Sequence, residues 1–264
     1  MILAAVTIRI WGGGNVNRKK MVWGVLTVVV IAVVVSLLVM IRFGSTFHTS
    51  TAENVEEINN SAELELIDVP LLSQHPKLPT GCESVAAVMV LNYYGEDVTS
   101  TDFASDWIKK SRDFYTYNGQ SFGPDPEKAF AGDPFTSYGY GCYAGVIADA
   151  VNLHSTKCVA QEVRGKSLEY LCSEYVDKGI PLLVWATIDM TKSRAGESWV
   201  LPDGSFFTWV SGEHCLVLLG YDDVNYYFND PNTGKTVGYE KSLTNMRFRE
   251  LGSQAVVITP KNTM

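Results

Sequence analysis

Histidine and cysteine are scarce in this sequence, which has four histidines and five cysteines among 264 residues. No Cys-x-x-Cys pair occurs, and no histidine stands at metal-ligand spacing from a cysteine. We therefore predict no metal and no cofactor. Because five is odd, at least one thiol stays outside any intrachain disulfide. The cysteines that could include a disulfide, with the pairing left open, are Cys142, Cys158 and Cys172.

Acidic residues are absent before Phe43, although the whole chain has 29 acidic and 21 basic residues. The negative charge therefore belongs to the remainder of the chain, which argues against a nucleic-acid partner. Hydrophobic residues make up 46% of the sequence and charged residues 19%. This balance excludes a disordered chain and indicates a globular domain.

Residues 21–41 contain no charged side chain. A membrane-spanning helix needs about 20 apolar residues, whereas the apolar part of a cleaved signal peptide has about 7 to 15. We predict a single transmembrane anchor here, with a cleaved signal peptide and secretion as the alternative. Basic residues cluster before this segment, so residues 1–20 are expected in the cytoplasm and the rest outside the cell, at the membrane. The basic residues are Arg9, Arg18, Lys19 and Lys20.

Residues 42–63 are polar and lack periodicity, which predicts a linker outside the cytoplasm. From residue 64 to 262 we expect one domain, since about 200 residues fit a single core. Apolar and capping patterns predict helices over 82–94, 102–110, 143–153 and 168–178, and strands over 181–188, 214–220, 226–229 and 255–258, with a hairpin around 202–204. Helices that precede strands in this way indicate an α+β fold with an antiparallel sheet.

Cys82 opens the most apolar of these helices, directly after Pro79-Thr80-Gly81. A thiol at a helix N-terminus meets the positive end of the dipole, and this can lower its pKa below about 8.5 and populate the nucleophilic thiolate. The competing interpretation is a small buried core cysteine. Position alone does not separate the two.

His214 supplies a base for such a nucleophile, and Asp230 follows it by sixteen residues. If two antiparallel strands pair about residue 222, the two residues are directly opposite, with Cβ atoms about 4.5–5.5 Å apart. The carboxylate could then fix the imidazole tautomer. Asn229 would face the other side, as would Cys215, and Asp222 and Asp223 would lie in a solvated turn.

Gln74, eight residues before Cys82, could share an oxyanion with the backbone N–H of Cys82, although a surface glutamine is the commoner case. The run VPLLSQHPKLPTGCESVAAVMVLNYYG, followed by HCLVLLGYDD and FNDPNTG, resembles papain-like cysteine peptidases related to the bacteriocin-processing, double-glycine leader peptidases. The resemblance spans about 66–258 and implies a papain-like fold. It also implies that Cys82 is the nucleophile, His214 its proton relay, Asp230 the orienting group and Gln74 the oxyanion donor.

The expected function is therefore a membrane-anchored cysteine hydrolase that cleaves peptide or amide bonds through an acyl-enzyme on Cys82. The chain lacks the Gly-x-x-x-x-Gly-Lys-Ser/Thr motif of ATP-binding exporters, so leader processing coupled to export is not expected. Two alternatives remain: a cell-wall amidase or acyltransferase, and a non-catalytic binding domain on the same scaffold. The substrate would be a peptide or cell-wall fragment, and the oligomeric state is left open.

Overall fold

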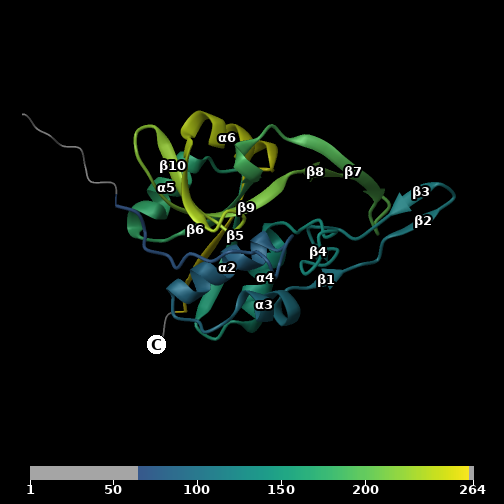
Figure 1. Cartoon of the computed structure of the whole chain (residues 1–264), viewed down its shortest axis with the longest axis horizontal. Coiled ribbons are helices and arrows are strands. Elements are labelled where there is room, and N and C mark those ends of the chain that lie inside the picture. Colours follow the sequence, from purple (N-terminus) through teal and green to yellow (C-terminus); the bar gives the residue numbers. More distant parts are fainter. Residues whose placement is uncertain (1–64, 262–264) are drawn as a thin grey trace, which may run out of the picture. The chain divides into compact units, whose positions relative to one another are not determined.

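The computed structural model describes residues 65–261 (Figure 1). The predicted anchor at 21–41 and the predicted linker at 42–63 lie outside the described residues. Within 65–261, no helix combines the length and the apolar character needed to cross a bilayer.

Helix α2 (Cys82–Tyr93) is the buried helix that the sequence predicted. Ten of its twelve residues are buried, beginning with Cys82 itself. Each buried Val, Leu or Met side chain contributes about 1.5–3 kcal/mol relative to exposure. A helix with apolar residues on every face is stable only inside a core, which fixes Cys82 at the start of an interior element.

The main sheet has six strands in the order β11-β10-β9-β6-β12-β5, and all of its pairings are antiparallel. Together with the helices around it, this sheet confirms an α+β fold. Its strands are β5 (Cys158–Arg164), β6 (Leu182–Thr187), β9 (Glu213–Tyr221), β10 (Asn225–Asp230), β11 (Lys235–Glu240) and β12 (Gln254–Pro260).

Two hydrophobic clusters cover the two faces of this sheet. Helices α2 and α4 (Ala144–His154) pack on one face, where Cys215 and Val217 of β9 are buried. Helices α5 (Leu168–Glu174) and α6 (Lys241–Glu250) accompany the other face, where Leu216 and Leu218 are buried (Figure 1). Alternate residues of β9 therefore point to opposite layers of the molecule.

A second, four-stranded sheet in the order β2-β3-β7-β8 contains the predicted hairpin. Much of the stretch at 111–141 is ordered by short strands, which pair with this hairpin and with one another. The strands are β1 (Lys110–Ser111), β2 (Tyr115–Tyr117), β3 (Gln120–Phe122), β4 (Phe130–Ala131), β7 (Arg194–Val200) and β8 (Phe206–Ser211).

Several boundaries differ from the predicted ones. The helix expected at 102–110 begins earlier, as α3 (Ser100–Asp102), because the Thr99 side chain accepts from the Asp102 N–H, and continues as the π-helix η1 (Phe103–Trp107). The helix expected at 168–178 is α5 followed by the 3₁₀ helix η2 (Val176–Lys178), and another such turn, η3 (Ile188–Met190), follows β6. Strands β5 and β11 and helix α6 were not predicted.

Candidate active site

Gly81 places Cys82 at the start of α2 by allowing a close approach of two loops. A Cβ atom at Gly81 would lie 2.9 Å from Leu78 Cβ and 3.2 Å from Pro134 Cβ, closer than side-chain carbons pack. Gly81 is the N-cap residue and provides no side-chain hydrogen bond to the helix. The first turn of α2 thus keeps backbone N–H groups that no cap side chain satisfies.

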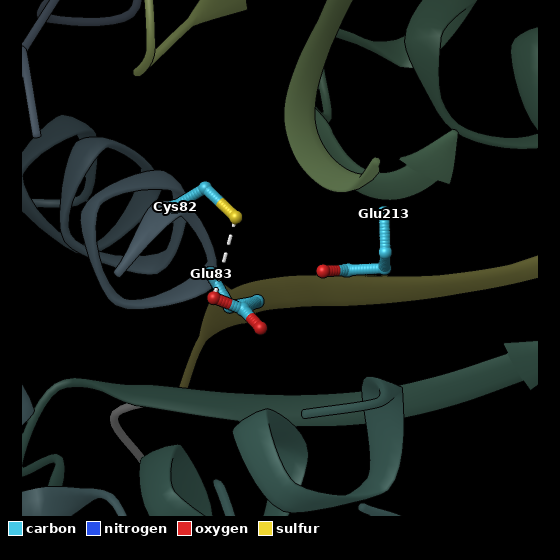
Figure 2. A group of neighbouring side chains, drawn as sticks. All are labelled: Cys82, Glu83 and Glu213. Atoms are coloured by element: carbon cyan, nitrogen blue, oxygen red, sulfur yellow. Dashed lines mark hydrogen bonds between the residues drawn. The ribbon is translucent and has the colours of Figure 1, made fainter. Parts of the chain in front are cut away.

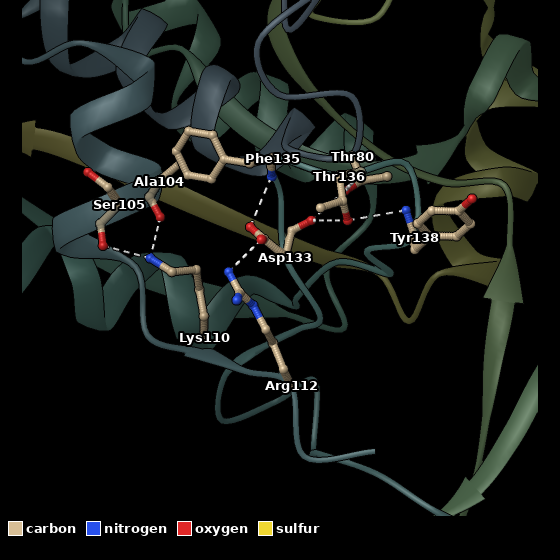
Figure 3. Close-up of polar contacts among 9 residues, drawn as sticks. All are labelled: Thr80, Ala104, Ser105, Lys110, Arg112, Asp133, Phe135, Thr136 and Tyr138. Carbon is tan, nitrogen blue, oxygen red and sulfur yellow. Dashed lines mark hydrogen bonds and ion pairs between the residues drawn. The ribbon is translucent and has the colours of Figure 1, made fainter. Parts of the chain in front are cut away.

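The residue before Gly81 ties this turn to the segment at 133–140 (Figure 3). Thr80 Oγ1 donates to the carbonyl of Thr136 at 2.9 Å and approaches that of Asp133 at 3.3 Å. Asp133 is itself held by an ion pair with Arg112, and its Oδ1 accepts from Phe135 N at 3.1 Å. The segment beside Cys82 is therefore held in place by a local hydrogen-bond network.

His214 and Asp230 form a buried pair. His214 Nε2 lies 2.7 Å from Asp230 Oδ1, and the two side chains are 2% and 1% exposed. This bond leaves Nδ1 as the ring nitrogen free for other chemistry. The contact that the sequence predicted between these two side chains is thus present.

The sequence predicted that His214 and Asp230 lie directly opposite each other in paired strands, but the strand register is different. Near the turn, Tyr227 pairs with Gly220, but a β-bulge shifts the register so that Phe228 pairs with Leu218 and Asn229 with Val217. Continued to Asp230, this register places it opposite Leu216, two residues from His214. A one-residue shift exchanges the faces of a strand, and the bulge is what puts Asp230 on the face of His214.

The charge of Asp230 is stabilised in spite of its burial. Desolvation alone would raise the pKa of this carboxyl, but hydrogen bonding and charge from His214, together with the Asn232 N–H at 2.8 Å, lower it below its ordinary value. Asp230 is therefore ionised at neutral pH and suited to stabilise an imidazolium.

The thiol of Cys82 lies in an acidic environment that the sequence analysis did not identify (Figure 2). Its Sγ donates to Glu83 Oε2 at 3.3 Å, and the Glu213 carboxylate is also close. Burial first, then the charges of Glu83 and Glu213, raise the pKa of the Cys82 thiol well above 9.0, while a hydrogen bond from the Cys215 backbone acts in the opposite direction.

This finding corrects one expectation. The sequence predicted that the helix N-terminus would lower the pKa of the Cys82 thiol, but desolvation and two carboxyl groups outweigh the dipole in this conformation. Glu213 and Cys215, which contribute to the thiol's electrostatic environment, flank His214 in β9. Within 65–261, no hydrogen bond joins Cys82 to His214 itself.

Glu83 is fixed by the chain segment just before α4. Its Oε1 accepts from the Cys142 N–H at 2.6 Å, and the Cys142 carbonyl accepts from Trp185 Nε1 at 2.9 Å. Glu83 is fully buried, and burial raises its pKa to about 7. Burial, and then the charge of Glu83, raise the pKa of Glu213 well above its ordinary value of 4.5.

Gln74 is buried, contrary to the usual surface position of this residue type. Its backbone N–H donates to Pro231, next to Asp230, and its Nε2 donates to the Pro79 carbonyl at 2.8 Å. Its Oε1 has no hydrogen-bond partner. Gln74 thus lies between the end of β10 and the turn before Cys82, with one amide hydrogen already engaged.

Other sequence-based expectations can be placed. Asp222 lies in the β9–β10 turn and accepts from Val224 and Asn225 N–H groups, Asp223 is exposed, and Asn229 faces away from Asp230. All five cysteines are buried and free of disulfides. Glu83 and Glu213 were missed, although each directly neighbours a predicted site residue in the sequence.

Comparison with known proteins places this chain in a family. The model of the Peptidase_C39 like family matches residues 66–256. The chain belongs to this family. It therefore contains a cysteine peptidase-like domain, as the resemblance over about 66–258 implied.

Three known proteins illustrate the similarity. The uncharacterized protein YvpB of Bacillus subtilis strain 168 is 32% identical over 211 residues, which are 79% of this chain and 81% of that protein. The crystal structure of a candidate C39-like peptidase from Bacillus anthracis has a TM-score of 0.64 and 27% identity, and covers 75% of this chain and 100% of that one. A double-glycine motif protease solved with its leader peptide is 17% identical with a TM-score of 0.45, covering 74% and 94% of the two chains.

Proposed function

We propose that the domain is a cysteine peptidase whose nucleophile is Cys82 and whose base is His214. The observation that carries this proposal is the buried His214–Asp230 hydrogen bond of 2.7 Å, next to the strand residues that approach the Cys82 thiol. Membership of the Peptidase_C39 like family supports the same chemistry.

In the proposed reaction, the thiol first rotates away from Glu83 and gives its proton to Nδ1 of His214. The thiolate attacks the carbonyl carbon, so a C–S bond forms and the carbonyl electrons move to oxygen. The imidazolium then protonates the leaving amine as the C–N bond breaks. Water hydrolyses the thioester with His214 as base, and the carboxylic acid leaves.

Two further groups have positioning or stabilising roles in this proposal. Asp230 holds the imidazole in the tautomer that presents Nδ1 and stabilises the imidazolium. The backbone N–H of Cys82 and the amide of Gln74 stabilise the oxyanion, which requires Gln74 Nε2 to use its second hydrogen or to leave the Pro79 carbonyl.

The test is turnover of a peptide library by the full-length protein in detergent, with acyl-enzyme trapping at acid pH followed by mass spectrometry. We expect cleavage and a thioester adduct on Cys82 in the wild type. Cys82→Ala should abolish both, and His214→Ala should abolish cleavage. Cys172→Ala, which removes a buried thiol of the other hydrophobic cluster, is the matched control and should retain activity.

One observation favours a non-catalytic binding domain as the second candidate: the Cys82 thiol donates to Glu83 and not to His214, and burial and nearby carboxyl groups raise its pKa well above 9.0. If no peptide is cleaved and no adduct forms on Cys82, this second function replaces the first. Cleavage at a cell-wall amide, or transfer of the acyl group to an amine instead of water, would identify the amidase or acyltransferase alternative. Analysis of the products separates these outcomes.

We also propose that residues 21–41 anchor the domain outside the cytoplasm. The support is the uncharged length of this segment and the basic residues before it. Protease treatment of intact cells should remove the domain and leave a short membrane fragment. A soluble mature chain that begins after residue 41 would instead show signal cleavage.

A further inference from the structure

Three side chains with metal-ligating atoms converge where α2 meets β9. The Sγ of Cys82 and one carboxylate oxygen each from Glu83 and Glu213 all lie within 4.8 Å of one another (Figure 2). Their exposures are 6%, 0% and 7%. Cys82 and Glu83 come from the first turn of the helix, whereas Glu213 comes from a strand 130 residues later in the chain.

Glu83 and Glu213 of this cluster have no Lys, Arg or His side chain as an ion-pair partner within 65–261. None of the ion pairs within 65–261 includes Glu83 or Glu213. Glu213 Oε1 is buried and has no hydrogen-bond partner. A buried carboxylate without a partner is costly, so the pair must be compensated by protons or by a bound cation.

The spacing of the donor atoms fits a tetrahedral zinc ion. With Zn–S of about 2.3 Å, Zn–O of about 2.0 Å and a tetrahedral angle, a sulfur and an oxygen ligand lie about 3.5 Å apart. Cys82 Sγ and Glu83 Oε2 are 3.3 Å apart. A cation could therefore replace the thiol proton with small movements of these two atoms, while Glu213 moves toward them by rotation about its own side-chain bonds.

The surroundings hold one ligand in place and leave room for both carboxylates. Glu83 Oε1 accepts from the Cys142 N–H, an outer contact of the kind that orients metal ligands. Gly141 has φ +149°, and a Cβ atom there would lie 2.5 Å from Glu83 Oε1 and 3.0 Å from Glu213 Oε2. Only a glycine leaves both carboxylates in their places.

We propose that Cys82, Glu83 and Glu213 bind one Zn²⁺ ion. A thiolate with two carboxylates suits Zn²⁺ better than Ca²⁺ or Mg²⁺, which prefer oxygen ligands alone. Binding releases the thiol proton and any proton held by the carboxyl pair, and a water completes the fourth position. The metal occupies the sulfur lone pair, so it blocks Cys82 as a nucleophile; this consequence rests on the proposed peptidase function, whereas the binding itself does not.

The metal spacing rules applied to the sequence do not find this site, because they compare cysteines and histidines that are close in the chain. The three ligands here include a single cysteine, and the glutamates are brought to it by the packing of α2 on β9.

The test uses the full-length protein in detergent, treated with chelator and then titrated with Co²⁺ as a spectroscopic substitute for zinc. We expect one equivalent to bind, with a thiolate-to-cobalt charge-transfer band and tetrahedral visible bands that Zn²⁺ displaces. Cys82→Ser should abolish the charge-transfer band. Glu213→Gln should weaken binding at least tenfold, and Cys172→Ser, which alters a remote buried thiol, should change neither.

The proposal is overturned if wild-type protein binds no Co²⁺ or Zn²⁺ by equilibrium dialysis, because protons alone then compensate the pair. It is also overturned if the charge-transfer band survives in Cys82→Ser or if Glu213→Gln binds as tightly as wild type. Circular dichroism establishes that each variant is folded, and Cys82→Ser keeps the side-chain volume. If the metal-free wild-type protein has no peptidase activity but still gives the charge-transfer band with Co²⁺, the proposed function is refuted and the metal site stands.

Discussion

His214 and Asp230 form a 2.7 Å hydrogen bond although they are not directly opposite each other in the β9–β10 ladder. The bulge at Tyr227–Phe228 shifts the register by one residue. Asp230 therefore lies on the same face as His214, but opposite Leu216, two residues from His214 in β9. Diagonal neighbours on one face remain within reach of such side chains. The bulge is therefore part of the construction of the site.

Asp230→Asn tests whether the charge of Asp230 matters beyond its shape. The amide can keep a contact with the imidazole but favours the wrong tautomer and does not stabilise an imidazolium. We expect kcat/KM to fall by roughly 10²–10⁴-fold, with little change in KM. Asp223→Asn, at an exposed turn position of the same hairpin, is the control and should leave the kinetics unchanged.

The Cys82 thiol should titrate above its ordinary range in the resting, metal-free protein. Because burial and the two carboxyl groups raise its pKa well above 9.0, iodoacetamide should label Cys82 slowly at pH 7, with a rate that rises with pH beyond 9. Glu83→Gln removes a negative charge and should shift this profile to lower pH. The measurement is mass-spectrometric mapping of the label with chelator present.

A wild-type labelling midpoint below about 8.5 would contradict this prediction. It would mean that the thiol rests against His214 as an ion pair in solution, and that the Glu83 contact is not the resting state. His214→Ala should leave the profile almost unchanged if the Glu83 contact dominates, and should raise the midpoint if the ion pair does.

Gly141→Ala should destabilise the domain more than an ordinary glycine replacement. The new Cβ would meet both buried carboxylates and would also require a positive φ, so we expect a loss of about 3 kcal/mol. Gly119 also has a positive φ, +75°, but a Cβ there has nothing within 4 Å. Gly119→Ala should therefore cost about 1–2 kcal/mol. Urea denaturation measures the free energy of unfolding of the two variants. Equal losses would show that the clash with the carboxylates does not contribute to the destabilisation by Gly141→Ala.

Glu96 should support stability at neutral pH and lose this effect in acid. It accepts from Ser155 Oγ at 2.6 Å and from Lys157 N at 2.9 Å; burial would raise its pKa, but these hydrogen bonds lower it below 4.5. A depressed folded-state pKa stabilises the native state above pH 4.5, and this contribution is lost as pH falls through the folded value.

Glu96→Gln should accordingly lower the free energy of unfolding by about 2 kcal/mol at pH 7 and by less at pH 3. Glu174→Gln, which removes an exposed ion pair with Lys178, should change stability by less than about 0.5 kcal/mol. Chemical denaturation at both pH values provides the comparison. A Glu96→Gln loss of equal size at pH 3 would show that the charge of Glu96 is not involved.

The elements that the sequence predicted are those with strong local signals. Helix α2 is apolar throughout, and Ser167 is a recognisable N-cap whose side chain accepts from the Tyr170 N–H. Strand β11 was missed because it is an edge strand with mostly exposed residues, and α6 because it is polar, with Thr244, Arg247 and Phe248 as its buried residues. Strand β5 does alternate at Cys158 and Ala160, so its period could have revealed it.

For the candidate site, the sequence indicated which residue types belong together but not how they are placed. A two-residue periodicity predicts faces correctly only in an uninterrupted ladder. The bulge opposite Phe228 lies beside Gly220 of β9, and this glycine is the residue that could have indicated it. Glu83 and Glu213 were missed because glutamate is seldom buried. Their burial depends on Cys142 and Gly141, which meet them only through the tertiary fold.

Strand β12, the last in the chain, lies inside the main sheet, between β6 and β5. Its neighbours cannot complete their hydrogen bonds until residues 254–260 are available, so the sheet closes only after this strand has been made. Cys82 is therefore synthesised well before the sheet that contains His214 is complete.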